Sequence, residues 1–453
     1  MANKVMLALH HATQTTARVW VRSTTAGALS LSCSAGTFSG GTVDPSIEDG
    51  CGLVTVTGLQ PGTSYPFVVS VAGAQVASGT LRTMPADGST FTIGFGTCPD
   101  YVRDALPLRT LMERFPDLAG MCWLGDNIYT SEPSDGTTVT VNGESLTGLE
   151  RLAPTVQATT MAQLYRHYRA YWQQRSTELM LQAVPNWFAF DDHDHMTGND
   201  YVRGNLASAN ATFSWASTAQ HLLDMEDWCH DAARAYTKGN PNWSGSDFYF
   251  AVRVNDALEL FFVDGIWYRD AVDGSGTTLL GNAQKAWLQA AVASSTATFK
   301  AVMCTKNLWG GADDFNKYNA ERAEMEAWIN TWPSWTVPGG LVWCSGDIHY
   351  PMVSYKPATP VVNVCSSPLG AGYNLFVGDG GYAVGSLQRR WKSSGHLSLG
   401  ASDATTYTAA AYIRPHGHER IEVGVVDNVG NTCWRGFVAA GTNELHYDRQ
   451  RVS

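Results

Sequence analysis

The sequence lacks a long apolar run, an excess of basic residues and a cysteine framework. None of its apolar runs approaches the ~18 residues that a membrane-spanning helix needs. Its 30 Lys and Arg are outnumbered by 41 Asp and Glu, and the net charge of −11 argues against a nucleic-acid partner, whose phosphates need a basic surface. The nine cysteines include no CxxC pair, so they imply no disulfide framework.

The first residues also lack the apolar segment of a signal peptide. They read MANKVMLALHHATQ and pass directly into strand-like sequence. As written, the chain is therefore expected in the cytoplasm. A leader that had been replaced by the initiating Met would leave the same sequence, so export stays open.

At 453 residues the chain is too long for one simple core, and two or three units are expected. Residues 1–85 form the first unit. They alternate apolar and polar residues, as in TTARVWVRST, with Gly or Pro every ~8–12 residues, which predicts a small β-sandwich. GLQPGTSYPFVVSV resembles the fibronectin type III pattern, with Tyr65 in the tyrosine-corner position. This unit carries no evident chemistry and is expected to be a packing or spacer module.

Residues 86–453 follow a different pattern, in which short continuous apolar runs alternate with amphipathic segments. The apolar runs are 91–98, 118–126, 187–192, 258–265, 299–307 and 341–350. The amphipathic segments are 104–115, 161–175, 282–294 and 320–330. Strands buried on both faces and separated by helices predict an α/β sheet covered by helices. The polar segment 130–160 is expected to be a long loop.

Four of the apolar runs end in residues that bind metals or move protons. The first ends in Cys98, and the second in Asp126 with Tyr129 three residues on. The other two end in DDHD at 191–194 and in Asp347 with His349. In an α/β sheet, ligands bind at the carboxyl ends of the strands, so these four ends are expected to form one site.

Each of these features also has a simpler explanation. A cysteine after a strand is usually a core residue, and an Asp-rich turn is often a helix cap or a solvated loop. Four coincidences at the same end of parallel strands favour the functional interpretation. HGH at 416–418 has a similar appearance, but it precedes a strand-like run rather than ending one, and we expect it to lie outside the site.

The motifs FGTC, LGDNIY, the stretch from YRAYWQQR to FAFDDHD, and WCSGDIHY occur in that order. Together they closely resemble the PhoD-type alkaline phosphatases, a branch of the metallophosphoesterases. The resemblance implies a four-layer αββα sandwich behind the fibronectin III-like β-sandwich, with residues 86–453 as the catalytic domain. It also implies hydrolysis of phosphate monoesters or diesters by a metal cluster that contains Fe³⁺ and Ca²⁺, with Mn²⁺ or Zn²⁺ as alternatives. Many proteins of this family are exported.

The resemblance assigns roles to individual residues. It implies that Asp126 bridges the metals, that Tyr129 binds iron as a phenolate, and that His193 acts in catalysis. The expected metal ligands are Cys98, Asp126, Tyr129, Asp192, Asp347 and His349. Further tentative metal or substrate residues are Asp191, Asn199, Arg103, Arg203 and Arg269.

The chemistry of these residue types agrees with the resemblance. Thiolate, phenolate and carboxylate donors suit a trivalent, redox-capable metal, and oxygen ligands suit a hard partner such as calcium or manganese. The expected nucleophile is a metal-bound hydroxide, because the cation lowers the pKa of its water. His193 is expected to bind phosphoryl oxygens or to protonate the leaving oxygen.

Two other functions stay open at this point. One is a diesterase directed at phospholipids or nucleotides, because the sequence does not separate monoesters from diesters. The other is a non-catalytic protein that binds sugars or surfaces on a phosphatase scaffold. The expected partner is a small phosphate ester, and the oligomeric state is open.

Overall fold

The computed structural model describes most of the chain. The described residues are 5–99, 105–129, 139–141, 144–146, 160–195, 219–241, 248–270, 278–309, 315–331, 341–348, 351–356, 359–366, 369, 388–392, 408–427, 432–440 and 445–448. The cysteines whose side chains are described are all free, as expected: Cys33, Cys51, Cys98, Cys122, Cys229, Cys304, Cys344 and Cys365. None of the helices in these ranges is both long and apolar enough to cross a lipid bilayer.

The amino-terminal unit is an antiparallel β-sandwich, as predicted. One sheet has the order β1 (Met6–Ala12), β2 (Ala17–Arg22), β5 (Cys51–Val56), and the other has the order β4 (Gly36–Val43), β3 (Gly27–Cys33), β6 (Ser64–Val71), β7 (Ala74–Arg82). The Tyr65 hydroxyl accepts a hydrogen bond of 2.8 Å from the backbone N–H of Gln60. This contact has the form of a tyrosine corner, whereas the fibronectin III assignment itself stays a prediction.

Two further sheets, each of seven described strands, form the centre of the molecule. The first has the order β12 (Asn186–Ala189), β9 (Leu118–Leu124), β8 (Thr92–Gly96), β20 (Ala409–His416), β21 (Arg420–Asp427), β22 (Thr432–Ala439), β23 (Leu445–Asp448). The second has the order β13 (Phe250–Arg253), β14 (Leu258–Val263), β15 (Phe299–Cys304), β16 (Leu341–Ser345), β18 (Thr359–Cys365), β17 (Met352–Lys356), β19 (Gln388–Lys392). Each of the six predicted apolar runs overlaps a strand of one of these sheets. The parallel strands are β12, β9 and β8 at one side of the first sheet, and β14, β15, β16 and β18 in the second.

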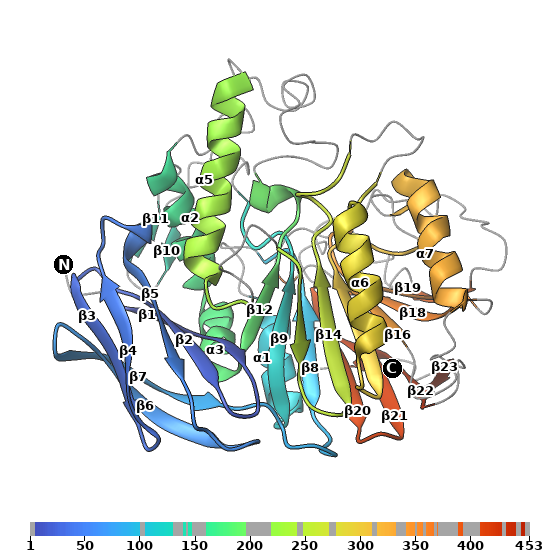
Figure 1. Cartoon of the computed structure of the whole chain (residues 1–453), viewed down its shortest axis with the longest axis horizontal. Coiled ribbons are helices and arrows are strands. Elements are labelled where there is room, and N and C mark those ends of the chain that lie inside the picture. Colours follow the sequence, from blue (N-terminus) through green and yellow to red (C-terminus); the bar gives the residue numbers. More distant parts are fainter. Residues whose placement is uncertain are drawn as a thin grey trace.

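Helices cover the outer face of each sheet, which confirms the predicted αββα order of layers (Figure 1). The first sheet is covered by α1 (Leu106–Arg114), α2 (Met161–Trp172), α3 (Arg175–Ala183) and α5 (Ala219–Thr237), and the second by α6 (Asn282–Ser294) and α7 (Asn319–Thr331). Between the sheets, side chains such as Phe95, Leu124 and Met303 belong to one continuous apolar core that extends into the β-sandwich. Burial on both faces explains why the six strands of these runs read as continuous apolar sequence.

The short elements lie in the connections. They are η1 (Glu48–Gly50), η2 (Asp192–His195), η3 (Phe315–Tyr318) and the hairpin of β10 (Val139–Val141) and β11 (Glu144–Leu146). The hairpin falls within segment 130–160, where the sequence predicted a long loop and no strands.

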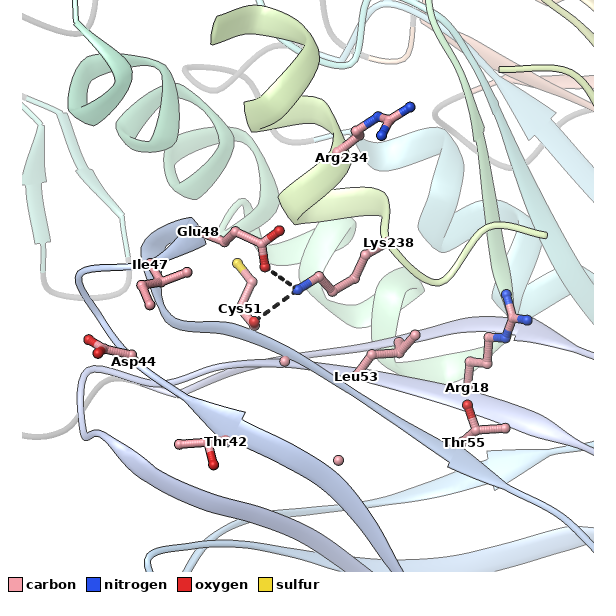
Figure 2. A pocket seen from close by; sticks show the side chains of 12 residues that line it. Arg18, Thr42, Asp44, Ile47, Glu48, Cys51, Leu53, Thr55, Arg234 and Lys238 are labelled. Atoms are coloured by element: carbon pink, nitrogen blue, oxygen red, sulfur yellow. Dashed lines mark hydrogen bonds and ion pairs between the residues drawn. The ribbon is translucent and has the colours of Figure 1, made fainter. Parts of the chain in front are cut away.

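The β-sandwich packs tightly on α5 and on the first sheet. Buried Trp20 donates from its indole N–H to the Ala235 carbonyl at 2.9 Å, and Asn186 donates to the Leu9 carbonyl at 2.9 Å. At the edge of this interface the ammonium group of Lys238 contacts Glu48 at 2.5 Å and the Cys51 carbonyl at 3.1 Å (Figure 2). The boundary between residues 85 and 86 stays a prediction.

Candidate active site

The carboxyl ends of strands from both central sheets meet at one place. In the first sheet, β8, β9 and β12 are parallel neighbours, and they lead to Cys98, Asp126 and Asp191. In the second sheet, β15 and β16 are parallel neighbours, and they lead to Lys306 and Asp347. The Cys98 sulfur lies 3.9 Å from the backbone oxygen of Asp347, so the two sheets touch at these ends.

Asp126 stands at the centre of the cluster. Its Oδ2 accepts from the Cys98 thiol at 3.3 Å and from the Tyr129 hydroxyl at 3.1 Å. Its Oδ1 accepts from the backbone N–H of His193 at 3.3 Å, and the His193 ring lies 4.3 Å from the Tyr129 ring, centroid to centroid. Two side chains and one backbone N–H, from residues that follow three neighbouring strands, therefore converge on one carboxyl group.

The backbone at these strand ends adopts an uncommon conformation. The φ angles of Cys98, Asp126 and Asp347 are 53°, 51° and 68°. Non-glycine residues rarely occupy this left-handed region, and such residues cluster at functional sites where the surrounding structure holds them in place.

The glycines of the LGD and SGD motifs allow the strand ends to approach each other. A Cβ on Gly125 would lie 2.5 Å from the Asp191 Cβ, and a Cβ on Gly346 would lie 2.7 Å from the Thr97 Cβ. Any larger residue would push the strand ends apart. Both glycines are therefore required by the packing that brings the acidic side chains together.

Asp194 and Asn127 join the ends of β9 and β12. Asp194 accepts from the Asn127 backbone N–H at 2.9 Å, from the Asn127 side-chain amide at 3.2 Å, and from the Asp191 backbone N–H at 2.9 Å. Asn127 also donates to the Ala189 carbonyl at 2.8 Å. Asp194, the third aspartate of DDHD, thus stabilises the loop through hydrogen bonds, whereas Asp191 and Asp192 belong to the acidic cluster.

Burial destabilises the ionised forms of the carboxyl and thiol groups in the site. It raises the pKa of Asp191, Asp192 and Asp194 above the ordinary aspartate value, and the nearby charge of Asp126 adds to the effect. Burial also raises the pKa of the Cys98 thiol well above its ordinary value, again with a contribution from Asp126. Such a set is stable in its deprotonated form only when a cation is present, because a bound metal reverses these shifts.

The residues present fit a metal ion. Two groups offer ligand atoms that lie within 4.8 Å of one another, namely Asp126–Asp192–His193 and Asp191–Asp192–Asp347. Cys98 and Tyr129 contact Asp126 and so extend the first group with a sulfur and a phenolic oxygen. Asp191 Oδ2 is buried and has no hydrogen-bond partner among the described residues. Donors of these types, buried together, are the ligand set of a metal centre.

The comparison of the sequence with known families decides the assignment. The profile of the family described as PhoD-like phosphatase matches residues 94–375, well over half of the chain and the whole of the cluster described above. The chain belongs to the PhoD-like phosphatase family. It is therefore a phosphoric ester hydrolase, and the resemblance inferred from its motifs is confirmed. A second profile, of a domain of unknown function (DUF7800), matches residues 7–88 of this PhoD-like phosphatase.

Solved structures with the same fold agree with the family assignment. A structure titled "Structure of PhoD" has a TM-score of 0.74 and 15% sequence identity, and the match covers 99% of this chain and 92% of that one. The purple acid phosphatase PPD1 from yellow lupin (Lupinus luteus) seeds has a TM-score of 0.60 and 11% identity, with 96% of this chain and 74% of that one covered. At these identities the likeness shows the fold alone. No curated protein sequence matches the chain.

The remaining residues expected in the site of the PhoD-like phosphatase fall into two groups, one described and one not. Arg269 is buried and lies close to Asp264, after β14. Arg103, Asn199, Arg203 and His349 lie outside the described residues. The HGH motif lies elsewhere, as expected: His416 pairs with Thr90 before the amino end of β8, and His418 contacts Asp256 at 2.9 Å.

Lys306 is the residue of the site that the sequence reasoning missed. Its side chain is 2% exposed, and its ammonium nitrogen lies 3.0 Å from Asp191 Oδ1 and 3.1 Å from Asp347 Oδ2. The available signal was a lysine at the end of the apolar run FKAVMCTK, because a charge at the end of a buried strand needs a partner.

Proposed function

We propose that this PhoD-like phosphatase hydrolyses phosphate monoesters or diesters with the help of metal held by residues from the set Cys98, Asp126, Tyr129, Asp192, Asp347 and His349. The observation that carries the proposal is that the Cys98 thiol and the Tyr129 hydroxyl both donate to the single carboxyl group of Asp126. A buried carboxyl group in contact with a thiol and a phenol offers the donors of a metal centre rather than of a packed core.

The donor types favour Fe³⁺ in this group, because a thiolate and a phenolate together stabilise a trivalent cation. The resemblance further implies Ca²⁺ beside it, with Mn²⁺ or Zn²⁺ as alternatives. When bound, such a cation neutralises the phosphoryl charge and lowers the pKa of water at the site. The protein supplies the burial that strengthens both effects, since Cys98, Asp126 and Asp192 are at most 1% exposed.

His193 is the residue best placed to act on the substrate. Its side chain is 29% exposed, whereas the Asp192 side chain beside it is 0% exposed. The backbone N–H of His193 is fixed on Asp126, which holds the imidazole at the open side of the cluster. From there it donates a proton to the leaving oxygen or a hydrogen bond to a phosphoryl oxygen. Arg269, Arg103 and Arg203 are the proposed candidates for gripping the phosphate, with Asn199 as a further ligand.

The sandwich of residues 1–85 is proposed to be a fibronectin III-like packing module for the catalytic domain of residues 86–453. Arg18 supports this role, because it donates to the carbonyls of Gly239 at 3.0 Å and Asn240 at 2.8 Å, just after α5. The module thereby fixes the carboxyl end of a helix that covers the first sheet.

An assay with p-nitrophenyl phosphate and bis(p-nitrophenyl) phosphate tests the proposal. The metal-replete protein should hydrolyse at least one of them, a chelator should abolish turnover, and re-added metal should restore it. The ratio of the two rates separates a phosphatase from a diesterase directed at phospholipids or nucleotides. Failure of the metal-replete protein to hydrolyse either ester would favour a non-catalytic binding protein, and undiminished turnover after metal removal would rule out the metal-dependent reaction.

A further inference from the structure

Lys306 brings a positive charge into the middle of the acidic cluster. It follows β15, the strand next to β16 in the second sheet, and its side chain is buried. Its ammonium nitrogen lies 3.0 Å from Asp191 Oδ1, 3.1 Å from Asp347 Oδ2 and 3.9 Å from Asp192 Oδ1. One side chain therefore ties carboxyl groups that come from the ends of both central sheets.

These three carboxyl groups are also the second group of side chains able to hold a metal ion. The ammonium group of Lys306 already makes the contacts that a cation would make there. A divalent ion bound among the same carboxyl groups would lie a few ångströms from the ammonium group, in a buried place where repulsion between like charges is weakly screened. The lysine and a resident divalent ion are therefore competing occupants.

We propose that Lys306 is a built-in cation of the centre and occupies the Asp191–Asp192–Asp347 group in place of a metal ion. The proposal rests on the proposed function, in which the group around Asp126 holds the catalytic metal. Asp192 belongs to both groups, so Lys306 acts through it as a positioning residue. The ammonium group attracts the Asp192 carboxylate at 3.9 Å and, with a metal bound in the group around Asp126, would help to fix the orientation of that carboxylate.

The same strand provides a matched control. Lys300 stands near the amino end of β15, is 4% exposed, and donates from its ammonium group to the Ala297 carbonyl at 2.6 Å. Lys300→Met and Lys306→Met make the same chemical change near the two ends of β15, but only Lys306→Met removes a charge from the acidic cluster.

Metal analysis of the full chain, purified without chelator and dialysed, tests the proposal directly. The wild-type protein should retain one metal ion per chain. Lys306→Met should bind Ca²⁺ or Mn²⁺ in addition, at least about tenfold more tightly than the wild type, because the competing charge is gone. Added Ca²⁺ or Mn²⁺ should raise the melting temperature of Lys306→Met and leave the wild type and Lys300→Met unchanged.

Retention of two metal ions by the wild type would overturn the proposal, and so would unchanged divalent binding in a folded Lys306→Met. The wild-type metal count decides the matter even if Lys306→Met does not fold. The proposed function is tested separately. Ester hydrolysis by a protein that retains two metals would reject the role of Lys306 and keep the function, whereas a protein with one metal and no hydrolysis of any ester would reject the function.

Discussion

Replacing Asp49 with asparagine should weaken the attachment of the β-sandwich to the catalytic domain. Asp49 lies in η1 between β4 and β5, with a side chain that is 12% exposed. Its carboxylate accepts from Arg22 at 2.6 and 3.0 Å, from Arg169 of α2 at 2.6 Å, and from the Tyr236 hydroxyl of α5 at 2.6 Å. One charge therefore joins the sandwich to two helices of the catalytic domain.

The size of the effect follows from these contacts. Hydrogen bonds to a charged group contribute about 1.5–3 kcal/mol each, and removing one partner of a buried ion pair costs about 3–5 kcal/mol. Asparagine keeps the shape and one acceptor, and it tolerates the left-handed backbone of Asp49, whose φ is 55°. We therefore expect a loss of about 3 kcal/mol, which arises from the charge and not from backbone strain.

Thermal unfolding followed by circular dichroism measures the change. A chain of 453 residues has an unfolding entropy of about 1 kcal/mol per kelvin, so the melting temperature should fall by about 3 °C. Asp44→Asn is the control, because Asp44 precedes η1 and its carboxylate accepts only from Ser46 in the described contacts, at 2.9 and 2.7 Å. Identical melting temperatures for Asp49→Asn and Asp44→Asn would refute the reasoning.

Three further changes test other parts of the molecule. His193→Ala should keep its metal but lose about 10²–10⁴-fold in turnover, with a smaller loss for esters that have good leaving groups, and loss of metal would make His193 a ligand instead. Tyr129→Phe should shift or abolish any colour that comes from a phenolate-to-iron transition, whereas His193→Ala should leave that absorption band in place. Burial and the charge of Arg18 lower the pKa of His10 to about 3, so unfolding exposes a histidine that gains a proton below pH ~6.5. Stability should therefore fall as the pH is lowered from ~6.5 towards 3, and the melting temperature of His10→Gln should fall less steeply than that of the wild type.

The strands and their polar ends were predictable because a strand buried on both faces requires a continuous run of apolar residues. A strand such as LAGMCWL shows no polar alternation, and the polar residue that follows it marks the point where it leaves the core. The alternating pattern of the β-sandwich was equally direct, since each of its sheets has one face outside the sandwich core.

Contacts between segments that are far apart in the sequence produced no comparable pattern of residues. β20 inserts next to β8, where Ala411 pairs with Phe95, across more than three hundred residues of sequence. Lys306 enters the cluster only because the second sheet packs face to face on the first, and Asp49 meets Arg169 only because the sandwich docks on α2. These contacts depend on the topology, which periodicity and spacing do not specify.

The central claim is that the carboxyl group of Asp126 organises a catalytic metal. Metal analysis and ester turnover, measured on one preparation of Asp126→Asn, test it most directly, because asparagine keeps the shape of Asp126 and tolerates its φ of 51°. Asp117→Asn, just before the amino end of the same strand, is the control. The account predicts a folded Asp126→Asn protein that has lost its metal and hydrolyses phosphate esters only at the background rate, beside an active control. A folded Asp126→Asn protein with normal metal content and normal turnover would contradict it.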